Sequence, residues 1–310
     1  MPSFLITVAG PTASGKTAFS IELAKHFNTE ILSADSRQFY REISIGTSKP
    51  SPEQLSEVPH HFVGNLSVSD EYNTYLFEED AIRCLGKIFS SGSVAVMTGG
   101  SGLYLDAVCN GMDAIPPSDK EIRRELETIF EEDGIESLQQ RLRVLDPGYY
   151  AEVDLKNPRR LFRALEVCLL TGKAYSSFRK KTRHPRPFTI IKTGMELPRE
   201  VLYERINSRV DAMFAAGLVE EVRSMIPYRH LTSLNTVGYR ELFDYFDGSL
   251  TLDQAADLIK KNTRHYARRQ LTWFRRDKEI KWFNPQDVPG AVEYVKKKMR
   301  EGGLSKIVLK

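Results

Sequence analysis

The sequence contains no long apolar run and very little cysteine. A membrane span needs about 18 or more apolar residues in a row, and the 310 residues contain no such run. The three cysteines, Cys84, Cys109 and Cys168, form no C-x-x-C pair. This scarcity argues against a disulfide framework or a zinc ribbon and fits a reducing cytoplasm. No basic segment precedes the first apolar run, so we expect no signal peptide.

Charge is nearly balanced over the whole chain but unevenly distributed along it. The 44 basic and 41 acidic residues leave a net charge of +3. Residues 156–186 hold ten basic side chains and one acid, and residues 260–278 hold eight and one. Two such segments favour a polyanionic partner. Two solvated helical faces would produce the same charge pattern.

Apolar periodicity predicts an α/β protein with a parallel sheet. Short β-rich runs alternate with segments of helical spacing through the first hundred residues, which is typical of strands joined by crossover helices. The middle of the chain has helical patterns alone, and a strand pattern returns after it. The predicted strands are residues 4–9, 30–34, 93–97, 188–194 and 280–283, and the predicted helices are residues 17–27, 73–89, 119–132, 135–145, 158–171, 199–225, 239–245 and 252–275.

The first predicted strand runs into the phosphate-binding pattern G-x-x-x-x-G-K-[ST], with a helix pattern directly after it. Glycines let backbone N–H groups wrap a diphosphate, and the helix N-terminus adds the positive end of its dipole. Lys16 supplies a cation, and the Thr17 hydroxyl can hold Mg²⁺. The predicted diphosphate-binding residues are Gly10, Pro11, Thr12, Ala13, Ser14, Gly15, Lys16 and Thr17.

These features together predict the domain organisation. We expect a P-loop NTPase-like parallel sheet core built from residues 1–117 and 188–310, with an inserted helical domain at residues 118–187.

The first carboxylate at the end of a predicted strand is Asp35. Ordinary P-loop NTPases carry an acid after a later strand to help hold the metal, but the strand at 93–97 is followed by Thr98, Gly99 and Gly100. This absence disfavours a motor or a GTPase. Because ligands of open parallel sheets bind at the carboxyl ends of strands, Asp35 could act as a base on an acceptor. It could equally cap the following turn through Ser36.

Motifs along almost the whole chain resemble those of the tRNA dimethylallyltransferase family, the isopentenyl diphosphate:tRNA transferases. They occur in the family's order, and the combination is far more specific than the glycine loop alone. The matching segments are residues 10–17, 35–40 (DSRQFY), 45–50 (IGTSKP), 60–61 (HH), 99–104 (GGSGLY), 157–166 (NPRRLFRALE), 237–241 (VGYRE) and 263–275 (TRHYARRQLTWFR).

The resemblance implies transfer of a dimethylallyl group from dimethylallyl diphosphate to N6 of adenosine 37 in the tRNA anticodon loop, with release of diphosphate. The tRNAs would be those that read codons starting with U. Lys16, Thr17 and Mg²⁺ would neutralise charge on the leaving group, and Asp35 would take the amino proton. An arginine after the insertion would bind the diphosphate, with Arg209 the first candidate and Arg205 the second.

The resemblance also implies contacts with the tRNA anticodon stem-loop and makes the inserted helical domain at residues 118–187 a tRNA-contacting one. The Gln38 amide could bond an adenine edge, and Ser101 keeps the hydroxyl of the threonine common at that position in bacterial members. Aromatic side chains between arginines, as in residues 268–275, suit RNA. The candidates are Asp35, Ser36, Arg37 and Gln38; Ser101; Arg123, with Arg124 as its alternative; Arg159, Arg160, Leu161, Phe162 and Arg163; Asn235, Thr236, Val237, Gly238, Tyr239 and Arg240; and Arg268, Arg269, Gln270, Leu271, Thr272, Trp273, Phe274 and Arg275.

Other functions compete with this one. A P-loop kinase of a small metabolite would also use the loop and Asp35, although it would not need the basic segments. Alkylation of a free adenine nucleotide would need no tRNA surface, and an RNA-binding protein with an inactive loop would leave Asp35 without a role. We expect a cytoplasmic monomer that acts on tRNA and dimethylallyl diphosphate and does not bind a membrane.

Overall fold

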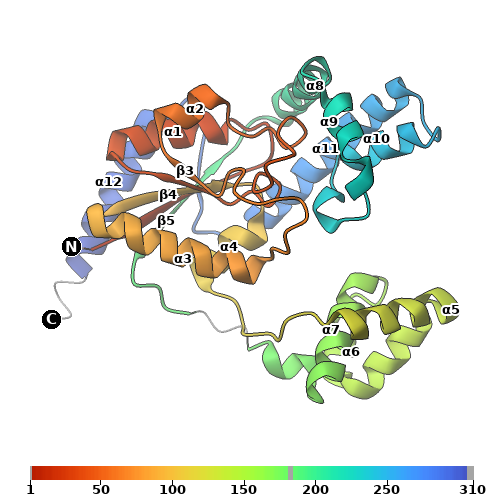
Figure 1. Ribbon diagram of the computed structural model, residues 1–310. Coiled ribbons are helices and arrows are strands. Elements are labelled where there is room, and N and C mark those ends of the chain that lie inside the picture. Colours follow the sequence, from red (N-terminus) through yellow and green to blue (C-terminus); the bar gives the residue numbers. More distant parts are fainter. Residues whose placement is uncertain (1, 181–183, 306–310) are drawn as a thin grey trace. The chain divides into compact units, whose positions relative to one another are not determined.

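The computed structural model describes residues 2–180 and 184–305 of the chain (Figure 1). It divides into two compact units, one made of Met1–Asn110 and Arg186–Lys310 and the other of Gly111–Pro185. The expected insertion at residues 118–187 overlaps the second unit, and its standing as an independent domain stays a prediction. Within the described residues, no helix combines the length and apolar character needed to span a membrane.

The first unit is built on a six-stranded sheet in the order β3-β2-β4-β1-β5-β6, and every pairing in it is parallel. Phe4 at the start of β1 lies opposite Val94 on one side and Thr189 on the other. The prediction of an α/β fold with a parallel sheet is therefore confirmed. The strands are β1 (Phe4–Ala9), β2 (Ile31–Ser33), β3 (His60–His61), β4 (Val94–Gly99), β5 (Thr189–Met195) and β6 (Lys281–Phe283).

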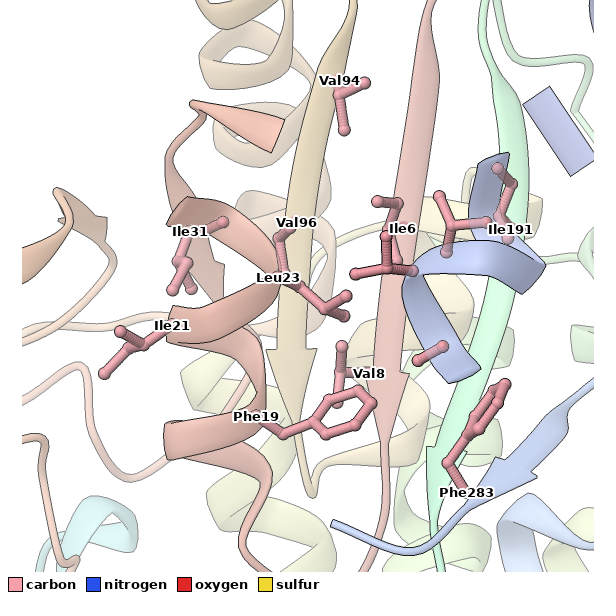
Figure 2. Close-up of a cluster of buried hydrophobic side chains, with 14 of the residues drawn as sticks. Ile6, Val8, Phe19, Ile21, Leu23, Ile31, Val94, Val96, Ile191 and Phe283 are labelled. Carbon is pink, nitrogen blue, oxygen red and sulfur yellow. The ribbon is translucent and has the colours of Figure 1, made fainter. Parts of the chain in front are cut away.

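Helices cover both faces of the sheet because side chains along β1 alternate between two cores. Ile6 and Val8 share a buried cluster with Phe19 and Leu23 of the first helix, as Figure 2 shows. Leu5 belongs to the opposite cluster. Burial on both faces explains why β1 reads as a continuous apolar run. The helices are α1 (Lys16–Phe27) and α12 (Val288–Ser305) on the first face, α3 (Thr74–Ser91) and α4 (Gly102–Asn110) on the second, and the short α2 (Pro52–Glu57).

Further helices of the first unit pack together beyond the sheet (Figure 1). The single helix expected at residues 199–225 is wrong, because Gly217 adopts a left-handed conformation with φ of 98° and separates two helices. Glycine takes that conformation without the steric cost a Cβ would add. The helices are α8 (Arg199–Ala215), α9 (Leu218–Ser224), α10 (Tyr239–Phe246) and α11 (Leu252–Phe274).

Within its described residues, the second unit contains helices joined by loops and no strand. Its helices bury an apolar cluster that includes Leu126, Leu138 and Leu165. The two helices expected at 119–132 and 135–145 are present as the two halves of α5, which are separated by the non-helical backbone of Gly134, with φ of 76° and ψ of −171°. A short helix that the sequence pattern did not predict begins at Pro147, between the helices expected at 135–145 and 158–171. The helices are α5 (Lys120–Leu145), α6 (Pro147–Glu152) and α7 (Pro158–Thr171).

Candidate active site

The glycine loop at the end of β1 has a conformation that only small residues allow. Gly10 and Gly15 have φ of 154° and 91°, and Ala13 is a non-glycine residue with φ of 62°. A Cβ at Gly10 would lie 3.1 Å from the carbonyl oxygen of Met195. The N-cap of α1 is Gly15, which has no side chain that could cap the helix. The loop therefore presents an uncapped helix N-terminus, which is a favourable place for an anion.

Buried polar groups in this loop fit a diphosphate. The Lys16 ammonium donates to the Pro11 carbonyl at 2.6 Å. Burial lowers the pKa of Lys16 to about 8; Asp35 opposes the shift and Arg209 adds to it. The Ser14 hydroxyl is fully buried and has no hydrogen-bond partner among the described residues. A partly buried cation and a buried, unpaired hydroxyl both gain from a bound anion.

Both candidate arginines of α8 approach the loop. The Nε of Arg209 donates to the Ser48 hydroxyl at 2.6 Å, and its Nη1 donates to the Thr12 hydroxyl at 3.4 Å. Burial lowers the pKa of Arg209, and Asp35 opposes this. Arg205 lies one turn earlier, with its Nη1 3.7 Å from the position a Cβ on Gly15 would take. Residues four apart share a helix face, so α8 can place two cations at the loop.

Asp35 begins a tight turn after β2 and lies in the electric field of the same cations. Its Oδ1 accepts from the Arg37 N–H at 3.1 Å, so the carboxylate does cap the turn, although through Arg37 rather than Ser36. The Ser36 N–H donates to the Ser101 hydroxyl at 3.0 Å. The pKa of Tyr266 is raised to about 12, mainly by burial and in part by the charge of Asp35. A hydrogen bond to Ser101 opposes this shift. The Oδ2 atom of Asp35 has no hydrogen-bond partner in the described part of the chain, and it remains available to an acceptor.

The side chains of Arg37 and Gln38 are engaged within the protein. Arg37 donates to the carbonyls of Thr232 and Ser233 at 3.1 and 2.8 Å and to that of Asn235 at 3.3 Å. The Gln38 amide donates to the Thr47 and Ser48 carbonyls at 3.3 and 3.0 Å. Because both of its N–H groups are used, the expectation that this amide bonds an adenine edge needs correction. These two residues position neighbouring loops.

Gln270 joins the glycine loop to the loop after β4. Its Oε1 accepts from the Thr12 N–H at 2.9 Å, and its Nε2 donates to the Gly100 carbonyl at 2.8 Å. The side chain is buried, and a Cβ on Gly100 would lie 2.2 Å from Nε2. Gln270 is therefore a structural link and not an open RNA contact.

The remaining tRNA candidates separate by exposure. The buried side chains complete apolar or polar cores, so they cannot present a surface to RNA. Those exposed are Arg124, Arg159, Arg160, Asn235, Arg240, Arg268, Arg269, Thr272, Trp273 and Arg275. Those partly buried are Arg163, Thr236, Val237 and Leu271, and those buried are Leu161, Phe162, Gly238, Tyr239 and Phe274.

Arg123 is also engaged internally, in the second unit. It donates to Glu127 and Glu166 at 2.9 Å each and lies 4.3 Å over the Phe162 ring. Glu166 is 1% exposed and also accepts from the Ser118 hydroxyl at 2.7 Å. Arg123 thus joins α5 to α7 around a buried carboxylate, a role that its position in the sequence did not indicate. Arg124 beside it is exposed.

The sheet and the loop after its central strand define a P-loop-type α/β protein. Residues 38–277 match the family model described as IPP transferase. The chain belongs to this family, and it is a transferase.

Curated relatives and solved structures agree with this membership. The tRNA dimethylallyltransferase 1 of Bacteroides thetaiotaomicron is 51% identical over 296 residues, which cover 96% of each chain. The tRNA dimethylallyltransferase of Christiangramia forsetii is 50% identical over 300 residues, covering 96% of this chain and 99% of that one. These relatives disfavour the small-metabolite kinase.

Two crystal structures extend the likeness to the fold. The full-length tRNA isopentenylpyrophosphate transferase of Bacillus halodurans is 34% identical, with a TM-score of 0.74 over 98% of this chain and 99% of that one. A eukaryotic dimethylallyltransferase, studied while acting on tRNA, is 24% identical with a TM-score of 0.79, covering 96% of this chain and 77% of that one. At that identity, the second match supports the fold alone.

Proposed function

We propose that this protein transfers the dimethylallyl group of dimethylallyl diphosphate to N6 of adenosine 37 in the tRNA anticodon loop. The observation that carries the proposal is the meeting of the glycine loop, two partly buried cations and one carboxylate. Asp35 acts electrostatically on both Lys16 and Arg209, although the three residues come from different parts of the chain. This arrangement combines an anion site with a base.

The residues divide the reaction between them. The bond between the dimethylallyl carbon and the diphosphate oxygen breaks, and its electron pair leaves with the diphosphate. Lys16 and Arg209 stabilise the negative charge that grows there. The adenine nitrogen forms the new bond to carbon, and its proton passes to Asp35.

Magnesium would assist at the same place. Thr17 supplies a hydroxyl oxygen at the start of α1, and Mg²⁺ accepts oxygen ligands of this kind. When bound, the ion would neutralise charge on the diphosphate oxygens.

The tRNA would reach the base site with its target adenine turned out of the helical stack. Enzymes that modify a base need this extrusion, and exposed arginines next to an aromatic ring suit the unstacked loop. Arg268, Arg269 and Trp273 form such an exposed set on α11. We propose that the protein acts as a monomer in the cytoplasm.

The test is transfer of the prenyl group to an anticodon stem-loop, with Asp35→Asn as the diagnostic variant. Wild type with Mg²⁺ and dimethylallyl diphosphate should alkylate the adenine. Asp35→Asn should slow the single-turnover rate by about 10²- to 10⁴-fold, the usual contribution of a general base, while the Kd for the stem-loop changes little.

Two results would contradict this function. One is turnover of ATP with a small acceptor and no reaction with RNA, which would favour the kinase. The other is an equal loss of RNA affinity and rate in Asp35→Asn, which would reduce Asp35 to its role as a turn cap.

A further inference from the structure

One sequence motif is not explained by the proposed reaction. Residues 45–50 match the family pattern, yet neither the resemblance nor the proposed reaction assigns them a role. In the structure, residues 44–49, which we call the bracket segment, place Ser48 against Arg209. The contacts of this segment with three other parts of the chain indicate its purpose.

One end of the bracket segment is held by a single carboxylate on α9. Glu221 accepts from the backbone N–H groups of Ser44 and Ile45 at 2.8 Å each and from that of Gly46 at 2.9 Å. The Tyr239 hydroxyl donates to the same carboxylate at 2.5 Å. A Cβ on Gly46 would lie 2.6 Å from the Tyr239 ring, so glycine permits this close approach. Four donors fix the carboxylate and the backbone to each other.

The other end is held from the turn that follows Asp35. The two amide N–H groups of Gln38 go to the carbonyls of Thr47 and Ser48. The Lys49 ammonium donates to the Tyr40 carbonyl at 2.5 Å and to the Ser44 hydroxyl at 3.2 Å. The backbone on both sides of Ser48 is therefore fixed before any ligand binds.

Ser48 itself adopts a conformation that favours glycine. Its φ is 46°, in the left-handed region that non-glycine residues seldom occupy. Non-glycine residues in this region concentrate where the surrounding structure uses them. A glycine at this position would adopt the conformation more easily but would lack the serine hydroxyl, which accepts a hydrogen bond from the Arg209 Nε at 2.6 Å.

This contact sets the orientation of Arg209. The guanidinium is bonded through Nε to Ser48 and through Nη1 to Thr12 of the glycine loop. Its Nη2 has no hydrogen bond to any other residue that the structure describes. Two anchors fix the plane of the group and leave one nitrogen for a ligand at the loop.

We propose that Ser48 is a positioning residue, which orients Arg209 toward the leaving diphosphate. This inference rests on the proposed function, because it assumes a diphosphate at the glycine loop. A group oriented in advance stabilises the developing charge without reorganising during the reaction. Its loss should therefore lower kcat more than it raises the KM for the donor.

The experiment compares Ser48→Ala with Ser48→Gly. Both variants lose the hydroxyl, but glycine relieves the left-handed backbone and alanine does not. If Ser48 orients Arg209, both should bind inorganic pyrophosphate about tenfold more weakly, as expected for loss of a hydrogen bond to a charged group. Both should also lower kcat by similar factors, although Ser48→Gly has the higher Tm.

The variant Arg209→Met supplies the second measurement. With the guanidinium removed, adding Ser48→Ala should cause no further loss of pyrophosphate affinity, because the pair acts as a unit. Calorimetry on the two single variants and the double variant gives this coupling directly.

The outcomes separate the two proposals. Wild-type protein that neither binds pyrophosphate nor alkylates RNA would overturn the proposed function and this inference together. Pyrophosphate binding by wild type, with unchanged affinity and kcat in both Ser48 variants, would overturn the role of Ser48 alone. Losses that follow Tm, mild for glycine and severe for alanine, would show that Ser48 only shapes the backbone.

Discussion

At the residue scale, Lys16 shows how burial can give a side chain a property that its type does not have. A lysine in water has a pKa of 10.5, whereas Lys16 titrates at about 8, because burial penalises its charge. Asp35 limits this shift and Arg209 adds to it. The ammonium gains its charge most easily when an anion lies beside it.

This property predicts pH-dependent diphosphate binding. Below about pH 8 Lys16 is already charged, and binding needs no proton at this site. Between about pH 8 and 10.5 the free folded protein has lost the proton, and the anion favours its return. Pyrophosphate affinity should therefore fall as pH rises through this window, and binding at pH 9 should take up protons. Calorimetry in two buffers of different ionisation enthalpy measures the uptake.

The matched control is Lys16→Arg. Arginine stays charged throughout this range, so the variant should bind without the extra uptake and with a flatter pH profile. Equal proton uptake in both proteins would assign the effect to the ligand itself and contradict the role of Lys16.

The same shift affects stability with a definite sign. The folded pKa is lower than the unfolded value, so the unfolded chain holds more protons between pH 8 and 10.5. The contribution of Lys16 to the free energy of unfolding therefore rises with pH across that window and is least favourable below it.

At the scale of elements, α11 has two faces with separate tasks. Ala255, Ile259 and Ala267 pack into the protein, and Gln270 holds the glycine loop from the same buried side. Arg268 is exposed and has no ion-pair partner among residues 2–180 and 184–305. The helix thus connects the loop with a basic surface. A helical period of 3.6 residues explains this segregation of faces.

We therefore expect Arg268→Ala to weaken tRNA binding through charge alone. The variant should bind less tightly and reduce the slope of log K against log salt by about 1, with an unchanged Tm. The control is Lys298→Ala on α12, which removes an exposed cation that pairs with Glu301. Titration of tRNA at several salt concentrations measures both. An unchanged slope for Arg268→Ala would make this face a solvated surface without an RNA contact.

At the scale of the whole molecule, the two compact units keep separate cores. The phosphate loop and Asp35 belong to the first unit, whereas the Glu166 cluster lies wholly in the second. Glu166 holds Arg123 and Arg163 at 2.9 and 3.6 Å in a position that is almost closed to water. Such a cluster makes stability depend on one carboxylate.

Glu166→Ala should therefore affect the stability of the helical unit and the tRNA affinity without affecting diphosphate binding in the first unit. Removing the buried carboxylate leaves both arginines without this ion-pair partner. The free energy of unfolding of the helical unit should fall by about 2–3 kcal/mol. This loss is smaller than for a fully buried ion pair, because both arginines are partly exposed. Pyrophosphate affinity should stay at the wild-type value while tRNA affinity falls. Denaturation followed together with both affinities checks this. An equal loss of pyrophosphate affinity would contradict independent units.

The sequence by itself determined the features that depend on residues close together in the chain. The glycine loop lies within eight residues, and the strand pattern of β1 is a short, continuous β-rich apolar run. The helix starts expected at residues 73 and 119 coincide with Asn73 and Asp119, whose side chains accept from the backbone N–H groups two and three residues later. The helix boundaries at Pro147 and Gly217 were not predicted. The local sequence pattern allows a helix to continue or to end at these residues, and the packing of the folded chain determines which occurs.

Only the tertiary structure decided which distant side chains meet. Ser48 and Arg209 are 161 positions apart, and Thr12 and Gln270 are 258 apart, so no local spacing could join them. The sequence alone suggested RNA contacts for three residues, Arg37, Gln38 and Arg123. Their hydrogen-bond donors are used within the protein, and those partners become neighbours only when the chain folds. Periodicity in the sequence shows which face of a helix or strand is apolar. Which faces pack against each other depends on the whole core, and this packing brings the residues of the site together.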